Sequence, residues 1–337
     1  MRVLIADKLE TVAAEGLSAI GLEVMFEPEL DAEGLEQRTR ACEPAVIVVR
    51  STRVPASVFA AAPGALKLVI RAGSGHDNID SSAAAERGVA VCNCPGMNAV
   101  AVAELTVGHL ISLDRRLPAQ DAELRAGRWN KKAFSRARGL KGRSLMVVGA
   151  GAIGLEVVRR AQAFGMRVGL QSRSLTGSQA AALGVDTVPY AREALLEALP
   201  SYDAVTMHVP LTDDSRGMCD GAFFSAMPRG SLFVNTSRGA IVDEDALAEA
   251  VRSRGLRAAI DVYRDQPSFK AGVFEPAIRD VVSESGGGVQ FSHHVGASTD
   301  QAQEAVADEV VRIVRVWRET GAFEHCVNAG LMGSRAG

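Results

Sequence analysis

The sequence predicts an α/β protein built from two doubly wound parallel sheets. Short apolar runs alternate with longer helix-like segments over most of the 337 residues. These runs are continuous instead of alternating with polar residues, which is typical of strands buried on both faces of a parallel sheet. One glycine-rich turn directly follows such a run and opens a helix-like segment. Together these observations favour repeated βαβ units.

Nine apolar runs are expected to form strands. Four belong to an N-terminal unit and read, in order, RVLIAD, AVIVVR, KLVIRAG and VAVCNC. Five more follow in a second unit and read SLMVVGAG, RVGLQS, DAVTMHVP, SLFVNTS and RAAIDVY. Helix-like segments such as GLEVVRRAQAFG and DEDALAEAVRSRG precede or follow the later runs. This alternation predicts a second parallel sheet.

Two long helices are expected to connect the units. Residues 98–117, rich in Ala, Val and Leu, follow a Pro-Gly pair and end near Pro118, and they are interpreted as a hinge into the second unit. Residues 300–321 carry Val and Ile at i, i+3, i+4 spacing, which predicts an amphipathic helix. Because this helix follows the second unit, we expect it to return to the first, after a flexible crossing at SGGG, residues 285–288.

The charge pattern indicates neither a nucleic-acid nor a membrane partner. Acidic and basic residues are interspersed, the formal net charge is −3, and no charged tail is present. No stretch approaches the ~18 uninterrupted apolar residues of a membrane span. The N-terminal MRVLIAD enters a strand-like run directly, without the pattern of a signal peptide.

The five cysteines are odd in number and lack zinc-finger spacing. Cys92 and Cys94 lie two positions apart, where ordinary reduced thiols are expected more readily than a metal site. We therefore predict no metal and a reducing compartment, most simply the cytoplasm.

A glycine loop predicts dinucleotide binding. Gly149, Gly151 and Gly154 have G-x-G-x-x-G spacing in LMVVGAGAIGLEVV, after a strand and at the start of a helix. Gly149 permits a tight turn, Gly151 admits a pyrophosphate, and Gly154 lets the helix pack against the strand. The helix N-terminus adds oriented N–H donors for the anion.

The end of the next strand favours NADP over NAD, although NAD remains possible. An Asp or Glu at this position would hold the ribose hydroxyls of NAD, but the chain has Ser172, Arg173 and Ser174. A guanidinium with flanking hydroxyls suits a 2′-phosphate. The alternative is that Arg173 stacks on adenine or points to solvent.

Seven motifs then occur in one order: RAGSGHDNID, NAVAVAE, GAGAIG, MHVPLT, NTSRGAIVDE, AAIDVY and HHVGAST. In order and spacing the chain resembles the D-isomer-specific 2-hydroxyacid dehydrogenases, and within them the phosphoglycerate dehydrogenase-like branch, from about residue 1 to residue 330. The resemblance implies a Rossmann cofactor domain, residues 99–290, inserted in a split flavodoxin-like substrate domain, residues 1–98 and 291–337. It also implies a homodimer built around the long helix and the arm that follows it.

The implied reaction transfers a hydride between NAD(P)H and C2 of a small 2-oxo or 2-hydroxy acid, with D specificity. Negative charge grows on the carbonyl oxygen, so the site needs a cation beside this oxygen and an acid that protonates it. Arg238 matches the family's substrate-binding arginine. His294 precedes an apolar residue and then G-x-S-T, and it matches the acid/base. Its neighbour His293 stands where the family often has proline, and we expect a conformational role for it.

Gln266 stands where the family has a glutamate that hydrogen-bonds the catalytic histidine. A carboxylate beside an imidazole raises the imidazole pKa, whereas a neutral amide only orients the ring. We therefore expect His294 to titrate lower than in glutamate-containing relatives.

The resemblance also implies further cofactor contacts, and Asp261 matches the residue that orients the nicotinamide. A strand-end Asp also caps turns, which is the alternative. The remaining cofactor-binding residues implied in this way are Ala152, Ile153, His208, Val209, Pro210, Thr236, Ser237, Gly296 and Ala297.

Four residues of the N-terminal unit are expected at the substrate. Ser74 and Gly75 offer backbone amides for a carboxylate, with an ordinary tight turn as the alternative. Arg50 and Arg53 suit a phosphate or a second carboxylate, or they are solvated charges beside a strand. The substrate is accordingly expected to be a small acid such as 3-phosphoglycerate.

Two other functions stay open at this point. Gln266 also suits a catalytically weak, cofactor-sensing binding protein of the same fold. A formate dehydrogenase-like enzyme pairs its histidine with glutamine too, but its proline before the histidine is missing here.

Overall fold

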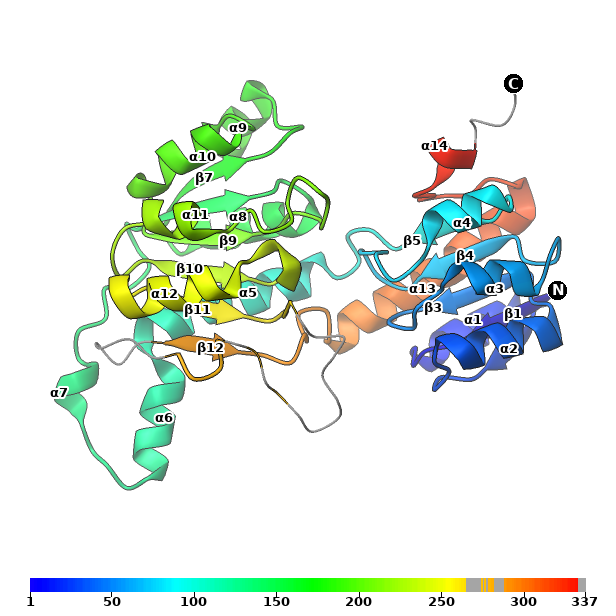
Figure 1. Ribbon diagram of the computed structural model, residues 1–337, viewed down its shortest axis with the longest axis horizontal. Coiled ribbons are helices and arrows are strands. Elements are labelled where there is room, and N and C mark those ends of the chain that lie inside the picture. Colours follow the sequence, from blue (N-terminus) through cyan, green and yellow to red (C-terminus); the bar gives the residue numbers. More distant parts are fainter. Residues whose placement is uncertain (265–273, 275, 277, 282–287, 333–337) are drawn as a thin grey trace. The chain divides into compact units, whose positions relative to one another are not determined.

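The computed structural model describes residues 1–264, 274, 276, 278–281 and 288–332. The chain forms two compact units, Met1–Asn98 with Ser298–Gly337, and Ala99–Ala297 (Figure 1). The return to the first unit falls at Ser298, later than the expected boundary at residue 291, because the turn after the last strand is hydrogen-bonded to Asp261 of the second unit. Residues 285–287 of the expected SGGG crossing lie outside the described part of the chain.

The first unit is a parallel sheet with helices on both faces. Its strand order is β2-β1-β3-β4-β5, which is the flavodoxin-like order. The strands are β1 (Arg2–Ile5), β2 (Glu23–Phe26), β3 (Val46–Val49), β4 (Leu68–Arg71) and β5 (Ala90–Asn93). The helices are α1 (Thr11–Ala19), α2 (Ala32–Cys42), α3 (Ala56–Ala61), α4 (Ser81–Glu86), α13 (Asp300–Thr320) and α14 (Ala329–Met332).

Helix α13 returns to this unit as the amphipathic pattern predicts. Val310, Ile313 and Val314 are fully buried and share one core with Leu17 of α1. The opposite face of the sheet is covered by residues of α2, α3 and α4, so the strand interiors are apolar on both sides except in the edge strand β2.

The second unit carries a seven-stranded parallel sheet with the order β12-β11-β10-β9-β6-β7-β8. The strands are β6 (Ser144–Val148), β7 (Arg167–Gln171), β8 (Asp186–Val188), β9 (Ala204–Met207), β10 (Leu232–Asn235), β11 (Arg257–Ile260) and β12 (Val289–Phe291). The strand order reverses between β6 and β9, which is where open α/β sheets bind ligands. The predicted α/β class with two parallel sheets is confirmed.

Helices cover both faces of this sheet as well. Those on one face are α5 (Ala99–Arg115) and α8 (Ala152–Ala163), whose apolar residues share a core with the strands. The other face carries α10 (Arg192–Ala198), α11 (Gly221–Ala226) and α12 (Glu244–Arg254). The remaining short elements are α9 (Gly177–Leu183) and the 3-10 turns η1 (Leu199–Ser201) and η2 (Gly239–Ile241).

Three strands were not predicted from the sequence, and all three lie at a sheet edge. They are β2, β8 and β12, each of which pairs with a single neighbour. Their residues are mostly exposed or half-buried, so they lack the continuous apolar run that identifies a central strand.

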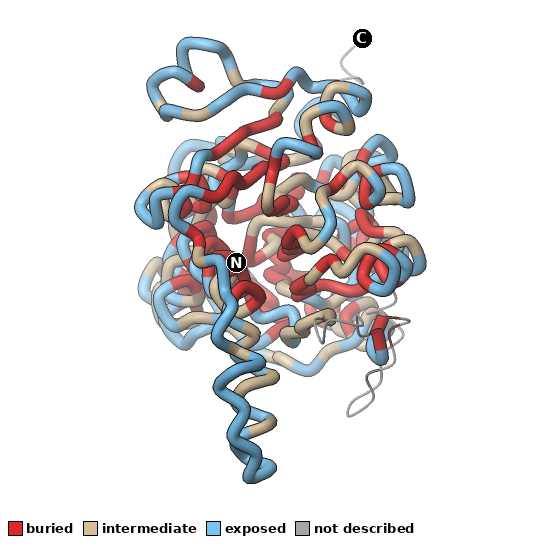
Figure 2. The backbone as a smooth tube through the Cα atoms, turned by 90° about the vertical axis from the view of Figure 1, so that its left-hand side faces the viewer, coloured by how far each residue is buried: buried red, intermediate tan, exposed pale blue. Residues whose placement is uncertain are grey.

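An arm follows α5 and consists of α6 (Leu117–Arg125), α7 (Lys131–Phe134) and the loops up to Gly139. The long helix ends at Arg115, because Arg116 adopts a left-handed conformation (φ +54°), and Pro118 lies in the first turn of α6 instead of ending α5. Neither α6 nor α7, which are labelled in Figure 1, has a buried residue (Figure 2). Among its apolar side chains, Trp129 is 80% exposed.

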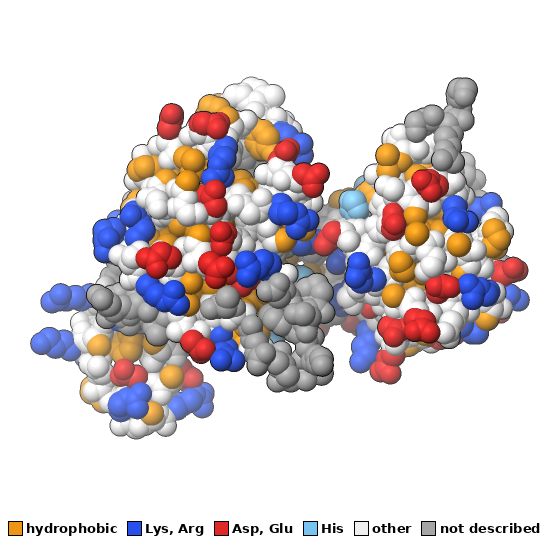
Figure 3. Space-filling model, viewed as in Figure 1, with side chains coloured by type: hydrophobic (Ala, Val, Ile, Leu, Met, Phe, Trp, Pro, Cys, Tyr) orange, Lys and Arg blue, Asp and Glu red, His pale blue; other side chains and the backbone are white. Residues whose placement is uncertain are grey.

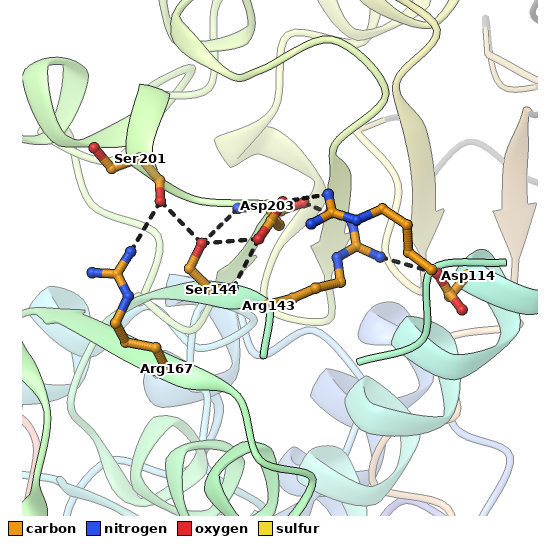
Figure 4. A network of polar contacts seen from close by, with 7 residues as sticks. Asp114, Arg143, Ser144, Arg167, Ser201 and Asp203 are labelled. Atoms are coloured by element: carbon orange, nitrogen blue, oxygen red, sulfur yellow. Dashed lines mark hydrogen bonds and ion pairs between the residues drawn. The ribbon is translucent and has the colours of Figure 1, made fainter. Parts of the chain in front are cut away.

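A buried ion pair ties the end of α5 to the sheet. Arg143 donates to Asp114 Oδ1 at 3.0 Å, and both residues are almost completely buried (Figure 4). The other oxygen of Asp114 accepts from the backbone of Gly139 at 2.9 Å, and Arg143 also reaches the carbonyl of Asp203. This network lies at the amino edge of the parallel sheet and leaves the carboxyl edge free for a site.

The surface agrees with the mixed charge pattern. On the face viewed in Figure 3, acidic and basic side chains are interspersed over both units. No helix in the described part of the chain is long and apolar enough to cross a membrane.

Candidate active site

Predicted cofactor residues and the predicted catalytic Arg238 gather at the carboxyl edge of the seven-stranded sheet. Because all seven strands are parallel, their carboxyl ends meet at this edge. The loops after β6, β7, β9, β10 and β11 carry Gly149, Arg173, His208, Arg238 and Asp261, respectively.

The glycine loop is shaped as the motif predicts. Gly149 has φ +109°, and a Cβ on it would lie 2.3 Å from the carbonyl oxygen of His208. A Cβ on Gly154 would lie 1.9 Å from the carbonyl oxygen of Gly149, so helix α8 packs directly against the loop. By contrast, apart from Gly151 and its two chain neighbours, no described residue has an atom within 4 Å of the Cβ position of Gly151. Gly151 is also the N-cap of α8 and provides no capping side chain, which suits an anion at this helix end.

The loop after β7 carries Arg173, the cation on which the expected preference for NADP depends. Ser172 Oγ lies 3.4 Å from Ser174 Oγ, and Arg173 is exposed between them. The guanidinium carbon of Arg173 lies 5.7 Å from the ring centroid of Tyr190, which is a cation–π distance. The sequence reasoning missed Tyr190, since no motif marks it.

His208 presents a neutral, partly buried ring beside the glycine loop. Its Nε2 lies 2.9 Å from Thr206 Oγ1. Nδ1 is buried and has no hydrogen-bond partner among the described residues. Burial lowers the pKa of His208 to about 3, so the ring is uncharged at neutral pH. Nδ1 therefore lacks a hydrogen bond from the described residues and lies beside the open glycine loop. A polar group of a bound dinucleotide could supply that hydrogen bond.

A buried asparagine shapes the loop that carries Arg238. Asn235 Oδ1 accepts from the backbone and the hydroxyl of Ser237, at 3.0 and 2.7 Å, and its Nδ2 donates to the carbonyl of Arg238 at 2.9 Å. A Cβ on Gly239 would lie 2.0 Å from the carbonyl carbon of Tyr263, so the loop is also held from the far side. Asn235 was not selected from the sequence. An Asn at the end of an apolar run can bond to the backbone of the following loop, but its full burial is visible only in the structure.

The neighbouring Thr236 is held from helix α5. Its hydroxyl lies 3.1 Å from that of Thr106, which also donates to the carbonyl of Val102 at 2.8 Å. The helix interpreted as a hinge therefore also supports the cofactor edge of the sheet.

Asp261 holds the turn that carries His294. The carboxylate is 1% exposed; Oδ1 accepts from Ser292 Oγ at 2.6 Å and from the backbone of Val295 at 3.0 Å. Oδ2 accepts from the backbone of Gly296 at 3.0 Å. His294 is exposed within this unit and adopts a left-handed conformation, with φ +54°. These bonds give Asp261 a role in shaping this turn, beyond the nicotinamide contact that the resemblance implies.

The expected substrate residues lie at the carboxyl edge of the first sheet. Asp7 Oδ2 accepts from the backbone of Arg50, Ser51 and Thr52 at 2.7, 3.1 and 3.0 Å. The Arg50 guanidinium donates to Gln303 at 3.0 Å. A buried carboxylate thus fixes the loop that carries both arginines.

The second substrate loop is held in the same unit. Ser74 donates from its hydroxyl to Asn98 Oδ1 at 2.7 Å, and its carbonyl accepts from Asn93 at 2.6 Å. Gly75 follows Ser74 in this loop. The predicted catalytic residue Gln266 lies outside the described residues. No group of three or more metal-ligating side chains occurs in the described ranges, where all five cysteines are free thiols.

Comparisons with known proteins agree with this geometry. Residues 107–276 match the model of the "D-isomer specific 2-hydroxyacid dehydrogenase, NAD binding domain". The D-3-phosphoglycerate dehydrogenase 2 of Arabidopsis thaliana chloroplasts is 36% identical over 93% of this chain and 48% of its own length. The chain spans about half the length of the curated relatives it matches.

Solved structures resemble the chain over almost its whole length. The TT0316 protein of Thermus thermophilus has a TM-score of 0.83 and 30% identity, over 97% of this chain and 100% of that one. An NADPH-dependent glyoxylate/hydroxypyruvate reductase of Sinorhizobium meliloti, crystallised with NADP and malonate, has a TM-score of 0.80 and 27% identity, over 97% of this chain and 96% of that one.

Proposed function

The chain belongs to the D-isomer specific 2-hydroxyacid dehydrogenase family, and we therefore propose that it transfers a hydride between NAD(P)H and C2 of a small 2-oxo acid. One observation carries the proposal. A turn pinned to Asp261 holds His294 at the same sheet edge as a glycine loop that leaves room for a pyrophosphate. The reaction is D-specific, and we assign the Ala99–Ala297 unit to the cofactor and the other unit to the substrate.

In the proposed reaction, His294 transfers the proton and Arg238 stabilises the negative charge. When bound, the nicotinamide supplies the hydride that reaches C2. The His294 imidazolium gives its proton to the carbonyl oxygen, which becomes the hydroxyl of the 2-hydroxy acid. Arg238 holds the substrate carboxylate and stabilises the negative charge that grows on the carbonyl oxygen. In the oxidation direction, His294 takes the proton back.

We propose NADP(H) as the preferred cofactor. Arg173 follows β7 without a neighbouring carboxylate, and Ser172 and Ser174 flank it with hydroxyls. A guanidinium in this position suits a 2′-phosphate, and the similar Sinorhizobium reductase was crystallised with NADP.

For the substrate we propose a small 2-oxo acid with a second anionic group, such as 3-phosphohydroxypyruvate. Arg50 and Arg53 lie on the loop that Asp7 fixes, and two cations suit a phosphate or a second carboxylate. The curated relatives named as D-3-phosphoglycerate dehydrogenases support the same choice.

We further propose a cytoplasmic homodimer. On the arm, Leu117, Leu124 and Trp129 are exposed, and no residue of α6 or α7 is buried. We therefore expect a second copy of the chain to bury these apolar side chains. Sedimentation of the wild type and of Trp129→Glu tests this: the wild type is expected to sediment as a dimer and the variant as a monomer. A monomeric wild type contradicts the proposal.

Turnover is the direct test of the function. We would follow nicotinamide absorbance with NADPH and then NADH, using 3-phosphohydroxypyruvate, hydroxypyruvate, glyoxylate and oxaloacetate as acceptors. Turnover that His294→Asn abolishes while cofactor still binds is the expected result. Cofactor binding without turnover on any acceptor would instead favour the cofactor-sensing protein, which Gln266 in place of the family glutamate already suggests.

A further inference from the structure

A buried hydrogen-bond chain runs from helix α5 to the turn that carries His294. His109 is 8% exposed, and its Nε2 lies 3.1 Å from Ser292 Oγ. Ser292 Oγ lies 2.6 Å from Asp261 Oδ1. His109 belongs to none of the motifs that identify the family, and neither it nor Ser292 was selected from the sequence.

The direction of these bonds follows from the groups themselves. The oxygens of Asp261 accept from Ser292 and from two backbone N–H groups, so the Ser292 hydroxyl donates its only proton to Asp261. The lone pair of that hydroxyl must then accept from His109, whose Nε2 carries a proton. Burial lowers the pKa of His109, although Asp261 partly opposes this, so the neutral Nε2–H tautomer is the form that fits.

The same carboxylate determines the conformation of His294. Both of its oxygens bind the backbone immediately after His294, and a Cβ on Gly296 would lie only 3.1 Å from Oδ2. A rotation of the Asp261 carboxylate would therefore move the turn and redirect the imidazole. Ser292 donates to Oδ1 of the same carboxylate and accepts from His109, so this pair adds a further restraint on that rotation.

We propose that His109 and Ser292 are positioning residues for the reaction, because together they fix the Asp261 carboxylate and through it the direction of the His294 ring. This inference rests on the proposed function. The ordinary alternative is a buried histidine that only fills the space beside α5.

The backbone at Ser292 is secured independently of its hydroxyl. Its N–H donates to the carbonyl of Ile260 at 3.1 Å, and its carbonyl accepts from the hydroxyl of Tyr263. Ser292→Ala therefore removes the link to Asp261 and leaves the strand end in place, which makes the variant a clean test.

The test compares variants that break the chain with one that preserves it. Ser292→Ala and His109→Leu break it, whereas His109→Gln keeps an N–H donor near the position of Nε2. The first two are expected to lower kcat about tenfold, with cofactor Kd changed less than about threefold, because a small misdirection of a catalytic group is costly. His109→Gln is expected to recover most of kcat. The double variant should lose no more than either single one, since both act through one link.

Ser231→Ala is the matched control. Its hydroxyl is buried, has no partner among the described residues, and lies just before β10 at the amino edge of the same sheet. This variant should keep the wild-type kcat. If Ser292→Ala and His109→Leu also keep it, or if His109→Gln is no better than His109→Leu, the positioning role is wrong.

A second readout separates this inference from the proposed function. The imidazole resonances of His294, assigned with His294→Asn in NMR spectra of the full chain with NADPH, should shift in Ser292→Ala and His109→Leu but not in His109→Gln. Absence of turnover in the wild type would contradict the proposed function and leave this measurement intact. Unshifted His294 resonances in both disrupting variants would overturn the positioning role, whatever the activity.

Discussion

The carbonyl oxygen of His208 occupies the space that a side chain on Gly149 would need, since a Cβ there would lie 2.3 Å from it. Gly149 is also in a positive-φ conformation, whereas the space around Gly151 is open. We therefore expect the two glycines of one motif to be required for different reasons: the first by the protein itself and the second by the proposed dinucleotide.

Gly149→Ala and Gly151→Ala should separate these reasons. Gly149→Ala is expected to lower the free energy of unfolding by at least ~1 kcal/mol, because the clash and the positive φ both oppose it. Gly151→Ala should change stability by less than ~0.5 kcal/mol but weaken cofactor binding at least about tenfold, as its methyl meets the pyrophosphate. Chemical denaturation and cofactor titration measure the two effects. Equal losses of stability in both variants would contradict this explanation.

Arg173 is expected to decide between the cofactors. Arg173→Gln removes the cation that we propose for binding the 2′-phosphate, so the Kd for NADPH should rise about tenfold or more while that for NADH stays nearly unchanged. Tyr190→Leu, which removes the ring beside Arg173, should have a smaller effect in the same direction. An Arg173→Gln protein that binds both cofactors less tightly by the same factor would point to adenine stacking instead.

Gln266→Glu should raise the upper pH limit of reduction. The resemblance implies that residue 266 contacts His294, where a carboxylate would favour the imidazolium, the form that donates the proton. We therefore expect the variant to stay active at higher pH than the wild type. The measurement is kcat/KM for reduction from about pH 5 to pH 9 in both proteins. A wild-type profile that stays flat from acid to well above neutral pH shows that Gln266 does not limit the reaction.

His208 should make the protein less stable in acid. Its pKa is about 3 in the folded protein against an ordinary value of 6.5, so the unfolded chain binds more protons between these values. The free energy of unfolding then falls as pH drops from 6.5 toward 3, by about 1.4 kcal/mol per pH unit for this one histidine. Urea denaturation at several pH values should show a shallower dependence of the free energy of unfolding on pH in His208→Asn than in the wild type.

The buried Asp114–Arg143 pair should matter more than an exposed pair nearby. Arg143→Met leaves Asp114 buried without its cation, which is expected to cost about 3–5 kcal/mol of stability. Arg167→Met breaks an ion pair with Asp186 in which both side chains are more than half exposed, and should cost less than ~1 kcal/mol. Denaturation midpoints compare the two, and similar losses would mean that burial does not govern this network.

Much of the fold and part of the site follow from local sequence. The central strands are recognisable because they are apolar on both faces. The Gly149–Gly154 loop is recognisable because a side chain on Gly149 or Gly154 would clash with nearby backbone, so the sequence must have glycine there. Three of the four edge strands, β2, β8 and β12, escaped prediction, since half-exposed strands need no continuous apolar run.

The residues that support the site emerge only from the packing of distant segments. His109 and Ser292 are 183 residues apart in sequence and meet only because α5 packs on the sheet beside the end of β12. Tyr190 likewise meets Arg173 only because β7 and β8 are paired. Local sequence was enough to indicate which residues have the right chemistry and at which sheet edge they would gather. Which partners orient those residues depends on side-chain contacts between distant segments, and only the packed fold brings these segments together.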